Sequence, residues 1–457
     1  MRPATLTEAA RAMGADLQTA RANVLVGGAA IDSRRVREGD LFFALHGRID
    51  GADFAPEAHL RGAAATVATR PLDVPTLVVD DPEEAMQRLA RWTLVRPDAP
   101  SPTVVGITGT VGKTTTKDAL ATILRHSGRR ISATEGNLNN ELGLPLTVLS
   151  ADPRTEVLVL EMGATHAGDI EHLCSIAPPE VGILTAISPV HLDSFGSLEG
   201  LAAAKGELAL ALPASGTLVA PAGAPERATG SGRKLGRRIT FAREGEADLE
   251  ASGIEGHDEG LRFVATIGGE SAEVRSPVFG THLVEPLLAS IGGALALGLD
   301  LKTAAQGLSR LRRTGLRGDV YRLKDDIVVY DDSYNASPAA VAAVLRYGSE
   351  QATRQRRRLV VVLGGMFELG PCAREYHREA GKLADEVGVD LLACVGDEAR
   401  WYAEAFQGKS LFYDDAVTAA QALRDELREG DYLIVKGSRG VGLDTLTRKL
   451  RESLALV

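Results

Sequence analysis

The sequence has few cysteines, no long apolar run and no excess of basic charge. Its three cysteines, Cys174, Cys372 and Cys394, lie far apart and form no C-x-x-C pair. This spacing gives no indication of a zinc site and suits a reducing compartment. No unbroken apolar stretch reaches the roughly 18 residues that a membrane-spanning helix needs. Residues 1–17 are typical of a short amphipathic helix and not of a signal peptide.

The net charge of -10 at pH 7 argues against a nucleic-acid or anionic-membrane surface, although a local basic pocket for an anionic ligand remains compatible with it. With 44% hydrophobic and 25% charged residues, the chain can bury ordinary globular cores. These features together predict a soluble cytoplasmic protein.

The length of 457 residues indicates two or three domains. A segment rich in proline and polar residues, 96–103, precedes a strand, and a second boundary at 311–320 separates a helical pattern from new strands. We therefore predict three domains, at 1–99, 100–313 and 314–457.

The strand pattern predicts an α/β protein. In the middle domain, apolar runs at 103–108, 156–162 and 181–188 alternate with helical patterns such as 113–126, which is typical of a parallel sheet covered on both faces. The last domain repeats this pattern, so a Rossmann-like doubly wound sheet is expected there. In the first domain, 40–45 and 65–70 favour a small α/β unit.

The stretch "GITGTVGKTTT" (106–116) indicates a phosphate-binding loop between a strand and a helix. It departs from a strict Walker A motif, because Ile107 stands where that motif has its first glycine. Glycines let backbone N–H groups converge on phosphate oxygens. Lys113 would then neutralise the β- and γ-phosphates and Thr114 would bind Mg²⁺. The alternative is a plain glycine turn.

Two further strands end in side chains that suit a metal site. Glu161 closes the run 156–161, and His191 follows the run 181–188. The carboxyl ends of parallel strands share one edge of a sheet, so both are expected near Thr114. Oxygen and imidazole ligands around a nucleotide fit Mg²⁺ or Mn²⁺. A hydrogen-bonded structural histidine remains the alternative for His191.

Lys205 lies in a helical pattern, on the same stripe as apolar residues (Leu198, Leu201, Leu208 and Leu212). A buried ammonium needs a partner or loses its charge. A neutral amine of this kind can take up CO₂ and become an anionic carbamate. The alternative is a lysine whose stem lies along the apolar surface with its head in water.

Seven segments occur in an order that resembles the Mur ligases: "DSRRVREGDLFFALHG", "GITGTVGKTTT", "EGNLNNELGLPLT", "LEMGATHAGDI", "HLDSFGSLEGLAAAKGEL", "YDDSYNASP" and "VKGSRG". The resemblance covers nearly the whole chain. Within the family, it is strongest to the members that add D-alanyl-D-alanine to UDP-N-acetylmuramoyl-tripeptide.

The resemblance implies a role for each matched residue. It implies a small UDP-binding domain, a central ATP-binding domain and a third domain that binds the amine and closes over the nucleotide. ATP binding is implied for Gly109, Thr110, Val111, Gly112, Lys113, Thr114, Thr115, His282, Arg317 and Asp332. Magnesium ligands would be Thr114, Glu161, His191 and a carbamylated Lys205; of these, Glu161, His191 and Lys205, with Lys113, would be catalytic. Substrate binding is implied for Asp32, Ser33, Arg34, Asn137, Asn140, Asn335, Lys436 and Arg439.

The implied reaction is an ATP-dependent amide ligation through an acyl phosphate, in peptidoglycan precursor synthesis by a monomer. The chain departs from the family at Leu283 and Pro286, where asparagines usually help to read adenine, and at Gly365, where aspartate is usual. Alternatives are a ligase that adds a single amino acid, a folylpolyglutamate synthase, or a P-loop switch. The D-N-P-R string that is usual in the single-amino-acid ligase is absent, and so is the N-K-x-D of a guanine-reading switch. A folylpolyglutamate synthase lacks a separate first domain.

Overall fold

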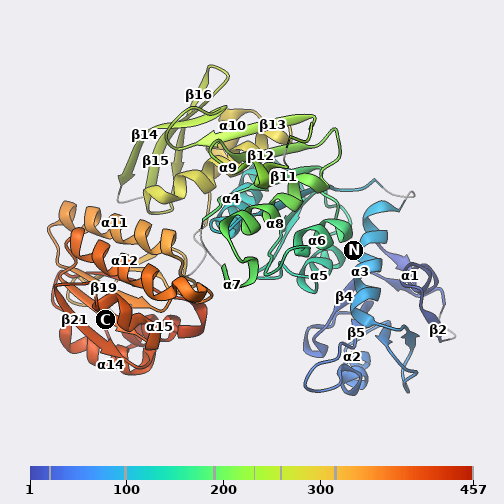
Figure 1. Ribbon diagram of the computed structural model, residues 1–457. Coiled ribbons are helices and arrows are strands. Elements are labelled where there is room, and N and C mark those ends of the chain that lie inside the picture. Colours follow the sequence, from blue (N-terminus) through green and yellow to red (C-terminus); the bar gives the residue numbers. More distant parts are fainter. Residues whose placement is uncertain are drawn as a thin grey trace.

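A computed structural model describes residues 1–19, 22–96, 100–188, 192–230, 232–257, 260–312 and 316–454. The predicted metal ligand His191 lies outside these residues. Three α/β units follow one another along the chain, each built around its own sheet, with the central unit lying between the other two (Figure 1). The α/β fold class predicted from the sequence is confirmed.

The N-terminal unit contains a five-stranded sheet in the order β2-β7-β6-β5-β4, and β2 is its antiparallel edge strand. The expected amphipathic helix near the N-terminus is α1, which Thr5 and Glu8 close with a reciprocal capping box. Its elements are β1 (Ala4–Thr5), α1 (Leu6–Met13), β2 (Asp16–Gln18), β3 (Leu25–Val26), β4 (Gly28–Ala30), β5 (Asp40–Phe43), α2 (Ala55–Leu60), β6 (Ala65–Ala68), β7 (Thr76–Val78) and α3 (Pro82–Val95).

The central unit contains a nine-stranded sheet in the order β16-β15-β14-β13-β12-β11-β8-β10-β9. Its elements are β8 (Thr103–Thr108), α4 (Lys113–His126), β9 (Ile131–Ala133), α5 (Gly143–Ser150), β10 (Val157–Glu161), α6 (Asp169–Ile176), β11 (Val181–Leu184), α7 (Leu192–Phe195), α8 (Leu198–Ala211), β12 (Thr217–Pro221), β13 (Arg237–Ala242), β14 (Leu249–His257), β15 (Gly260–Ile267), β16 (Glu270–Ser276), α9 (Val284–Ala296) and α10 (Leu301–Leu308).

The predicted parallel sheet of the middle domain is confirmed for the strands from β9 to β14, and the end of the sheet is antiparallel. β14, β15 and β16 form an antiparallel meander that extends the parallel part. Buried and exposed side chains alternate along much of these strands, as in a sheet with one face in water. These strands contain no near-continuous apolar run, which is why the apolar pattern of the sequence did not predict them.

The C-terminal unit has a six-stranded sheet in the order β17-β18-β22-β19-β20-β21, parallel except for β17. Helices cover both of its faces. Its elements are β17 (Asp319–Arg322), β18 (Val328–Asp332), α11 (Pro338–Gln355), β19 (Leu359–Gly364), α12 (Ala373–Glu386), β20 (Leu391–Val395), α13 (Arg400–Ala403), β21 (Lys409–Tyr413), α14 (Ala416–Glu426), β22 (Tyr432–Lys436) and α15 (Leu443–Ser453).

The first two units share one apolar cluster. Phe43 and Leu89 of the N-terminal unit belong to the same buried cluster as Leu144 and Ile170 of the central unit. The α-amino group of Met1 adds a bond across this junction, donating to the Leu149 carbonyl at 2.5 Å. The C-terminal unit has separate clusters on the two faces of its sheet, and from the central unit Phe279 joins one of them.

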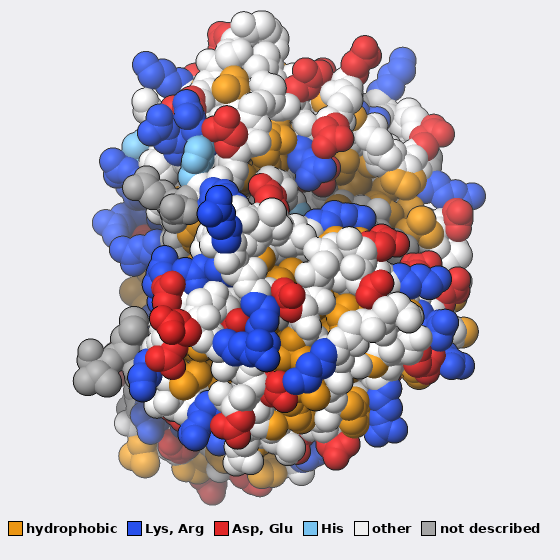
Figure 2. Space-filling model, turned by 90° about the vertical axis from the view of Figure 1, so that its left-hand side faces the viewer, with side chains coloured by type: hydrophobic (Ala, Val, Ile, Leu, Met, Phe, Trp, Pro, Cys, Tyr) orange, Lys and Arg blue, Asp and Glu red, His pale blue; other side chains and the backbone are white. Residues whose placement is uncertain are grey.

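The surface mixes both signs of charge. Basic and acidic side chains are interspersed over the face shown in Figure 2, in keeping with the absence of a basic excess in the sequence. Among the residues that the structure describes, no helix is long and apolar enough to cross a membrane.

The packing of α12 against α13 requires a glycine. A Cβ on Gly381 would lie 2.1 Å from the Tyr402 carbonyl oxygen, which is backbone and cannot rotate away. We expect Gly381→Ala to lower the free energy of unfolding by about 1–3 kcal/mol, the usual cost of overpacking. Gly223→Ala is the control, because a Cβ there has open space around it. Equal midpoints of urea unfolding for the two variants would contradict this account.

Candidate functional site

The phosphate loop runs from the end of β8 to the start of α4. Gly109 and Gly112 have φ angles of 143° and 83°, a region that favours glycine. Gly112 is the N-cap of α4, so the loop meets the partial positive charge of the helix N-terminus. A Cβ on Gly109 would also lie 2.1 Å from the Thr185 hydroxyl oxygen. This close packing, together with the positive φ angle, explains why position 109 is glycine.

Lys113 is folded back onto the loop that precedes it. Its Nζ donates to the carbonyls of Gly109 at 2.7 Å and Thr110 at 3.3 Å. Burial lowers the pKa of Lys113; the charge of Glu161 opposes this shift and that of Arg317 adds to it. These electrostatic effects place one carboxylate and a second cation near the lysine, although Arg317 belongs to the C-terminal unit.

Glu161 and Thr114 meet at the carboxyl edge of the sheet, as the strand pattern predicts. β10 pairs in parallel with β8, and Glu161 lies opposite Ile107. The Thr114 hydroxyl donates to Glu161 Oε2 at 2.9 Å, and Asn139 Nδ2 donates to Oε1 at 2.9 Å. Glu161 is 3% exposed. Carboxylate and hydroxyl oxygens form a donor set that fits Mg²⁺.

Lys205 is buried on α8, as the stripe of apolar residues predicts, but Leu198 is 39% exposed and does not belong to that stripe. Its Nζ donates to the Ala164 carbonyl at 3.2 Å and lies 5.3 Å from the centre of the Phe195 ring. Burial, and next the charge of Lys113, lower the pKa of Lys205 to about 7. The alternative of a lysine head in water is excluded by this burial.

Lys436 occupies a different environment from the one predicted. It is 3% exposed, forms an ion pair with Asp332 and donates to the Asn335 carbonyl at 3.0 Å. Asp332 and Lys436 stand opposite each other on the neighbouring strands β18 and β22. The expectation of a cation open to a substrate carboxylate is therefore corrected at Lys436, since its charge is already paired.

His282 lies near this pair although it belongs to the central unit. Burial lowers its pKa to about 4; the charge of Asp332 partly opposes the shift and that of Lys436 adds to it. Its Nδ1 has no hydrogen-bond partner among the described residues. A buried acceptor or donor of this kind fits a ligand that bonds there.

Two arginines share the ring of Tyr334. The Arg317 guanidinium lies 4.0 Å from the ring centre and that of Arg439 lies 5.7 Å from it. Arg439 also pairs with Asp444 at 3.0 Å and remains 57% exposed. Arg317 and Tyr334 line a cavity of about 760 Å³ that extends to Thr114. The structure thus brings the C-terminal unit to the phosphate loop through Arg317.

The residues predicted to hold the UDP-linked substrate lie on the N-terminal unit and on the loop after β9. Arg34 bonds both carboxylate oxygens of Asp32, at 2.9 and 2.7 Å, and these bonds lower the pKa of Asp32 to about 2. Ser33 donates to Glu57 at 2.7 Å. Asn140 Oδ1 accepts from the N–H of Gly143, the first residue of α5, at 3.0 Å. Asn137 is exposed.

Sequence reasoning missed three residues of the site: Asn139, Tyr334 and Glu57. Asn139 stands between the predicted Asn137 and Asn140, and nothing in the pattern shows which of the three amides faces Glu161. Tyr334 is adjacent to the predicted Asn335 and could have been included as an aromatic neighbour of arginines. Glu57 belongs to a helix with no motif of its own.

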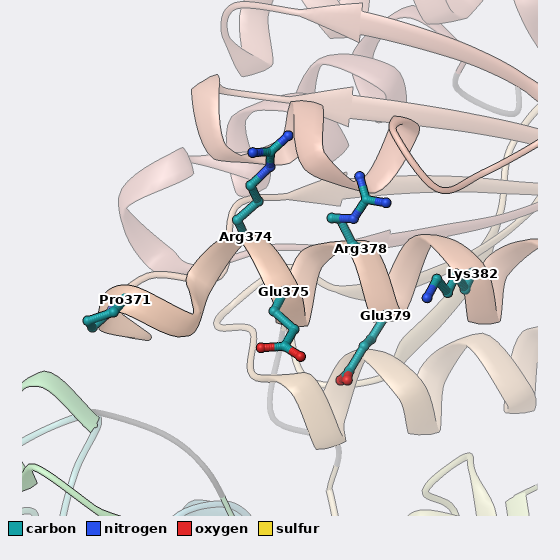
Figure 3. A pocket seen from close by; sticks show the side chains of 6 residues that line it. All are labelled: Pro371, Arg374, Glu375, Arg378, Glu379 and Lys382. Atoms are coloured by element: carbon teal, nitrogen blue, oxygen red, sulfur yellow. The ribbon is translucent and has the colours of Figure 1, made fainter.

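A second hollow lies on the outer face of α12. It has a volume of about 540 Å³ and is lined by residues that include Arg374, Arg378 and Glu379. Figure 3 shows the two arginines on one side of the helix and Glu375 and Glu379 on the other. Both arginines pair with Glu404, at 2.9 and 2.7 Å. None of the predicted site residues lines this hollow.

The glycine loop between a parallel strand and a helix N-terminus places the protein in the P-loop class of α/β proteins. Three family models match it: the Mur ligase middle domain at 107–294, the Mur ligase glutamate ligase domain at 316–439 and the Mur ligase family catalytic domain at 26–93. The chain belongs to the Mur ligase family, as the similarity to full-length relatives also shows.

Relatives called UDP-N-acetylmuramoyl-tripeptide–D-alanyl-D-alanine ligase are similar over almost the whole chain. That of Escherichia coli is 31% identical over 98% of both chains, and that of Bacillus subtilis is 31% identical over 94% of both. Among solved structures, MurF from Acinetobacter baumannii has a TM-score of 0.87 at 28% identity, covering 99% of both chains. MurF ligase from Thermotoga maritima in complex with ADP has a TM-score of 0.80 at 30% identity, covering 93% of this chain and 98% of that one.

The lowered pKa of Lys205 predicts a pH-dependent stability. The unfolded chain releases this proton near pH 10.5 and the folded chain near 7. Between these values the unfolded state binds more protons, so the free energy of unfolding rises with pH. Below about pH 7 the cost of burying the ammonium is fully present. Replacing the lysine with methionine removes that cost.

In CO₂-free buffer we expect Lys205→Met to be more stable than the wild type at about pH 6, with the gap closing towards about pH 9.5. The difference in free energy of unfolding between the two proteins should change by up to about 1.4 kcal/mol per pH unit. Urea unfolding across the range measures the gap, and Lys302→Met on the exposed face of α10 is the matched control. A gap that does not change with pH would contradict the assignment.

Proposed function

We propose that this protein is an ATP-dependent ligase that joins D-alanyl-D-alanine to the terminal carboxylate of UDP-N-acetylmuramoyl-tripeptide, a step of cytoplasmic peptidoglycan precursor synthesis. Family membership and the names of full-length relatives support the reaction. The observation that carries most weight in the molecule is the Thr114–Glu161 hydrogen bond beside the phosphate loop and Lys113. This contact supports a metal site at the point where we propose that a phosphoryl group is transferred.

ATP is the proposed phosphoryl donor. The relative from Thermotoga maritima was solved in complex with ADP, and the residues proposed to bind ATP here are Gly109–Thr115, His282, Arg317 and Asp332. The Nδ1 of His282 has no partner among the described residues, and the charge of Asp332 acts on this ring; a bond from Nδ1 to the base or the ribose would suit both observations. Arg317 and Lys113 would approach the phosphates from different units.

The chemistry follows from the weakness of a carboxylate as an electrophile. An oxygen of the tripeptide carboxylate attacks the γ-phosphorus of ATP, and ADP leaves. The resulting acyl phosphate is attacked by the free amine of the dipeptide, a proton is lost, and the tetrahedral intermediate expels phosphate as the amide forms. Positioning and charge neutralisation supply most of the catalysis in such transfers. Lys113 and Arg317 provide the positive charge.

Thr114 and Glu161 are proposed to hold Mg²⁺, with His191 and a carbamate on Lys205 as further ligands. Bound Mg²⁺ would neutralise charge on the transferred phosphoryl group. Because the pKa of Lys205 is lowered to about 7, a substantial fraction of its amine is neutral near neutral pH and can add CO₂. The carbamate replaces a buried cation with an anion beside Lys113, which removes the repulsion between the two lysines.

The three units, with proposed boundaries at 1–99, 100–313 and 314–457, are proposed to gather three substrates between them. The UDP-linked substrate would bind Asp32, Ser33, Arg34, Asn137 and Asn140. The dipeptide would bind the C-terminal unit near Asn335 and Arg439, because Arg439 is still exposed. Lys436 is proposed to act indirectly, by holding Asp332 in place for the ribose.

The dipeptide test separates this function from its alternatives. We expect phosphate release from ATP to require both the UDP-muramoyl tripeptide and D-alanyl-D-alanine. Free D-alanine should be at least roughly a hundredfold poorer, since a site built for a longer zwitterion leaves polar groups unpaired. Arg439→Ala should raise KM for the dipeptide far more than KM for ATP, whereas exposed Arg448→Ala should change neither. Phosphate release without any amine would indicate a switch ATPase.

The carbamate on Lys205 has its own test. Lys205→Ala should lose activity by on the order of 10²–10³, the cost of removing one preorganised electrostatic group. Added acetate or formate should restore part of the activity, because a small carboxylate can take the place of the carbamate. Lys205→Arg should stay inactive. Full activity of Lys205→Arg in a steady-state ligation assay would show that only a cation is needed.

A further inference from the structure

Lys117 is a buried lysine that the proposed reaction does not use. It follows Lys113 by one turn of α4 and is 5% exposed. Its Nζ donates to the Thr134 carbonyl at 2.8 Å and pairs with Asp118 at 2.6 Å. Burying an ammonium is costly unless its donors are satisfied. The bond to Thr134 therefore fixes the place where the chain leaves β9.

Thr134 continues the β9–β10 ladder in an unusual way. Its N–H donates to the Val159 carbonyl at 3.1 Å, as an ordinary residue of the ladder would. The next donor on β10, the Glu161 N–H, bonds the Thr134 hydroxyl at 3.0 Å. The side chain takes the position of a backbone acceptor, and the Thr134 carbonyl accepts from Lys117 instead.

This exchange determines where the following loop runs. The chain turns away from the sheet after Thr134 and returns with Asn139, whose carbonyl accepts from the Gly163 N–H at 2.8 Å. Asn139 Nδ2 then reaches Glu161 Oε1 at 2.9 Å. Glu161 is thus held at its backbone by Thr134 and at its carboxylate by Asn139 and Thr114.

We propose that Lys117 and Thr134 are positioning residues that fix the Glu161 carboxylate for its metal ion. The chain of contacts runs from Lys117 through the Thr134 carbonyl to the Thr134 hydroxyl, and from there to the backbone of Glu161. Lys117 lines the same cavity as Thr114, and the proposal gives it a role through Thr134 and not through direct contact with the metal. The proposal rests on the proposed function, because it takes Glu161 as a ligand of Mg²⁺.

Two matched pairs of variants test the two contacts. Thr134→Val keeps the shape of the side chain and removes the hydroxyl, whereas Thr134→Ser keeps the hydroxyl. Lys117→Met keeps the length and removes the charge and the donors, whereas Lys117→Arg keeps a cation with donors. Unfolding midpoints show which variants retain the fold, and the threonine pair stands alone if Lys117→Met fails to fold.

The measurement is the binding of ADP by calorimetry as Mn²⁺ is added. Loss of a group that orients a metal ligand typically weakens metal binding about 10–100-fold. We expect Thr134→Val and Lys117→Met to raise the half-saturating Mn²⁺ concentration by at least about tenfold, with the metal-free Kd for ADP unchanged. Thr134→Ser should stay within about threefold of the wild type, and Lys117→Arg should fall between it and Lys117→Met.

Glu161→Gln separates the two ways in which the idea can fail. If Glu161→Gln weakens the Mn²⁺ effect and folded Thr134→Val does not, the positioning role is wrong and the metal site stands. If Glu161→Gln leaves the Mn²⁺ effect unchanged, Glu161 is no metal ligand, and that part of the proposed function fails with it. An equal loss in Thr134→Val and Thr134→Ser would also overturn the role of the hydroxyl.

Discussion

Gly109 lies so close to Thr185 that no side chain could stand in its place, and the site depends on this approach. Hydrogen bonds run across it in both directions. The Thr185 hydroxyl donates to the Val111 carbonyl at 2.6 Å, and the Thr110 N–H donates to the Ala186 carbonyl at 2.9 Å. The phosphate loop is thereby ordered against the segment that follows β11 before a ligand arrives, which reduces the loss of entropy on binding.

Cations act on one another around the loop. The charge of Arg317 adds to the lowering of the Lys113 pKa, which Glu161 opposes. The charge of Lys113 adds to the lowering of the Lys205 pKa, which Asp169 and Glu207 oppose. Burial already disfavours both ammonium groups, so each added cation raises the cost. An anionic ligand between them would relieve this repulsion and draw Arg317 of the C-terminal unit towards the loop. Binding of a phosphate group and approach of that unit are therefore coupled through the same charges.

The part of the site that could be predicted from the sequence consists of residues at or just after the carboxyl ends of parallel strands. Parallel register brings Thr114 and Glu161 to one edge, so their proximity followed from two apolar runs. The same rule would have placed Asp332 beside Lys436, but those residues were assigned to different ligands. A buried ammonium is costly unless it is paired or hydrogen-bonded, and Lys436 pairs with Asp332. The motif does not reveal that Lys436 is buried. Asn139 shows the same limit, because the path of a loop selects one amide out of three.

The two junctions between units differ in kind. The first unit shares an apolar cluster with the central one, which fixes the proposed UDP-substrate residues relative to the phosphate loop. The C-terminal unit joins through Phe279 and polar contacts, such as the bond from Arg354 to the Gly256 carbonyl at 2.8 Å. Polar junctions of this kind allow units to move. Under the proposed function, the first two units hold the carboxylate substrate and the phosphate loop as one pair, and the unit that carries the amine is the one able to close. Closure of the C-terminal unit with its amine bound would keep water from the acyl phosphate while the amine attacks.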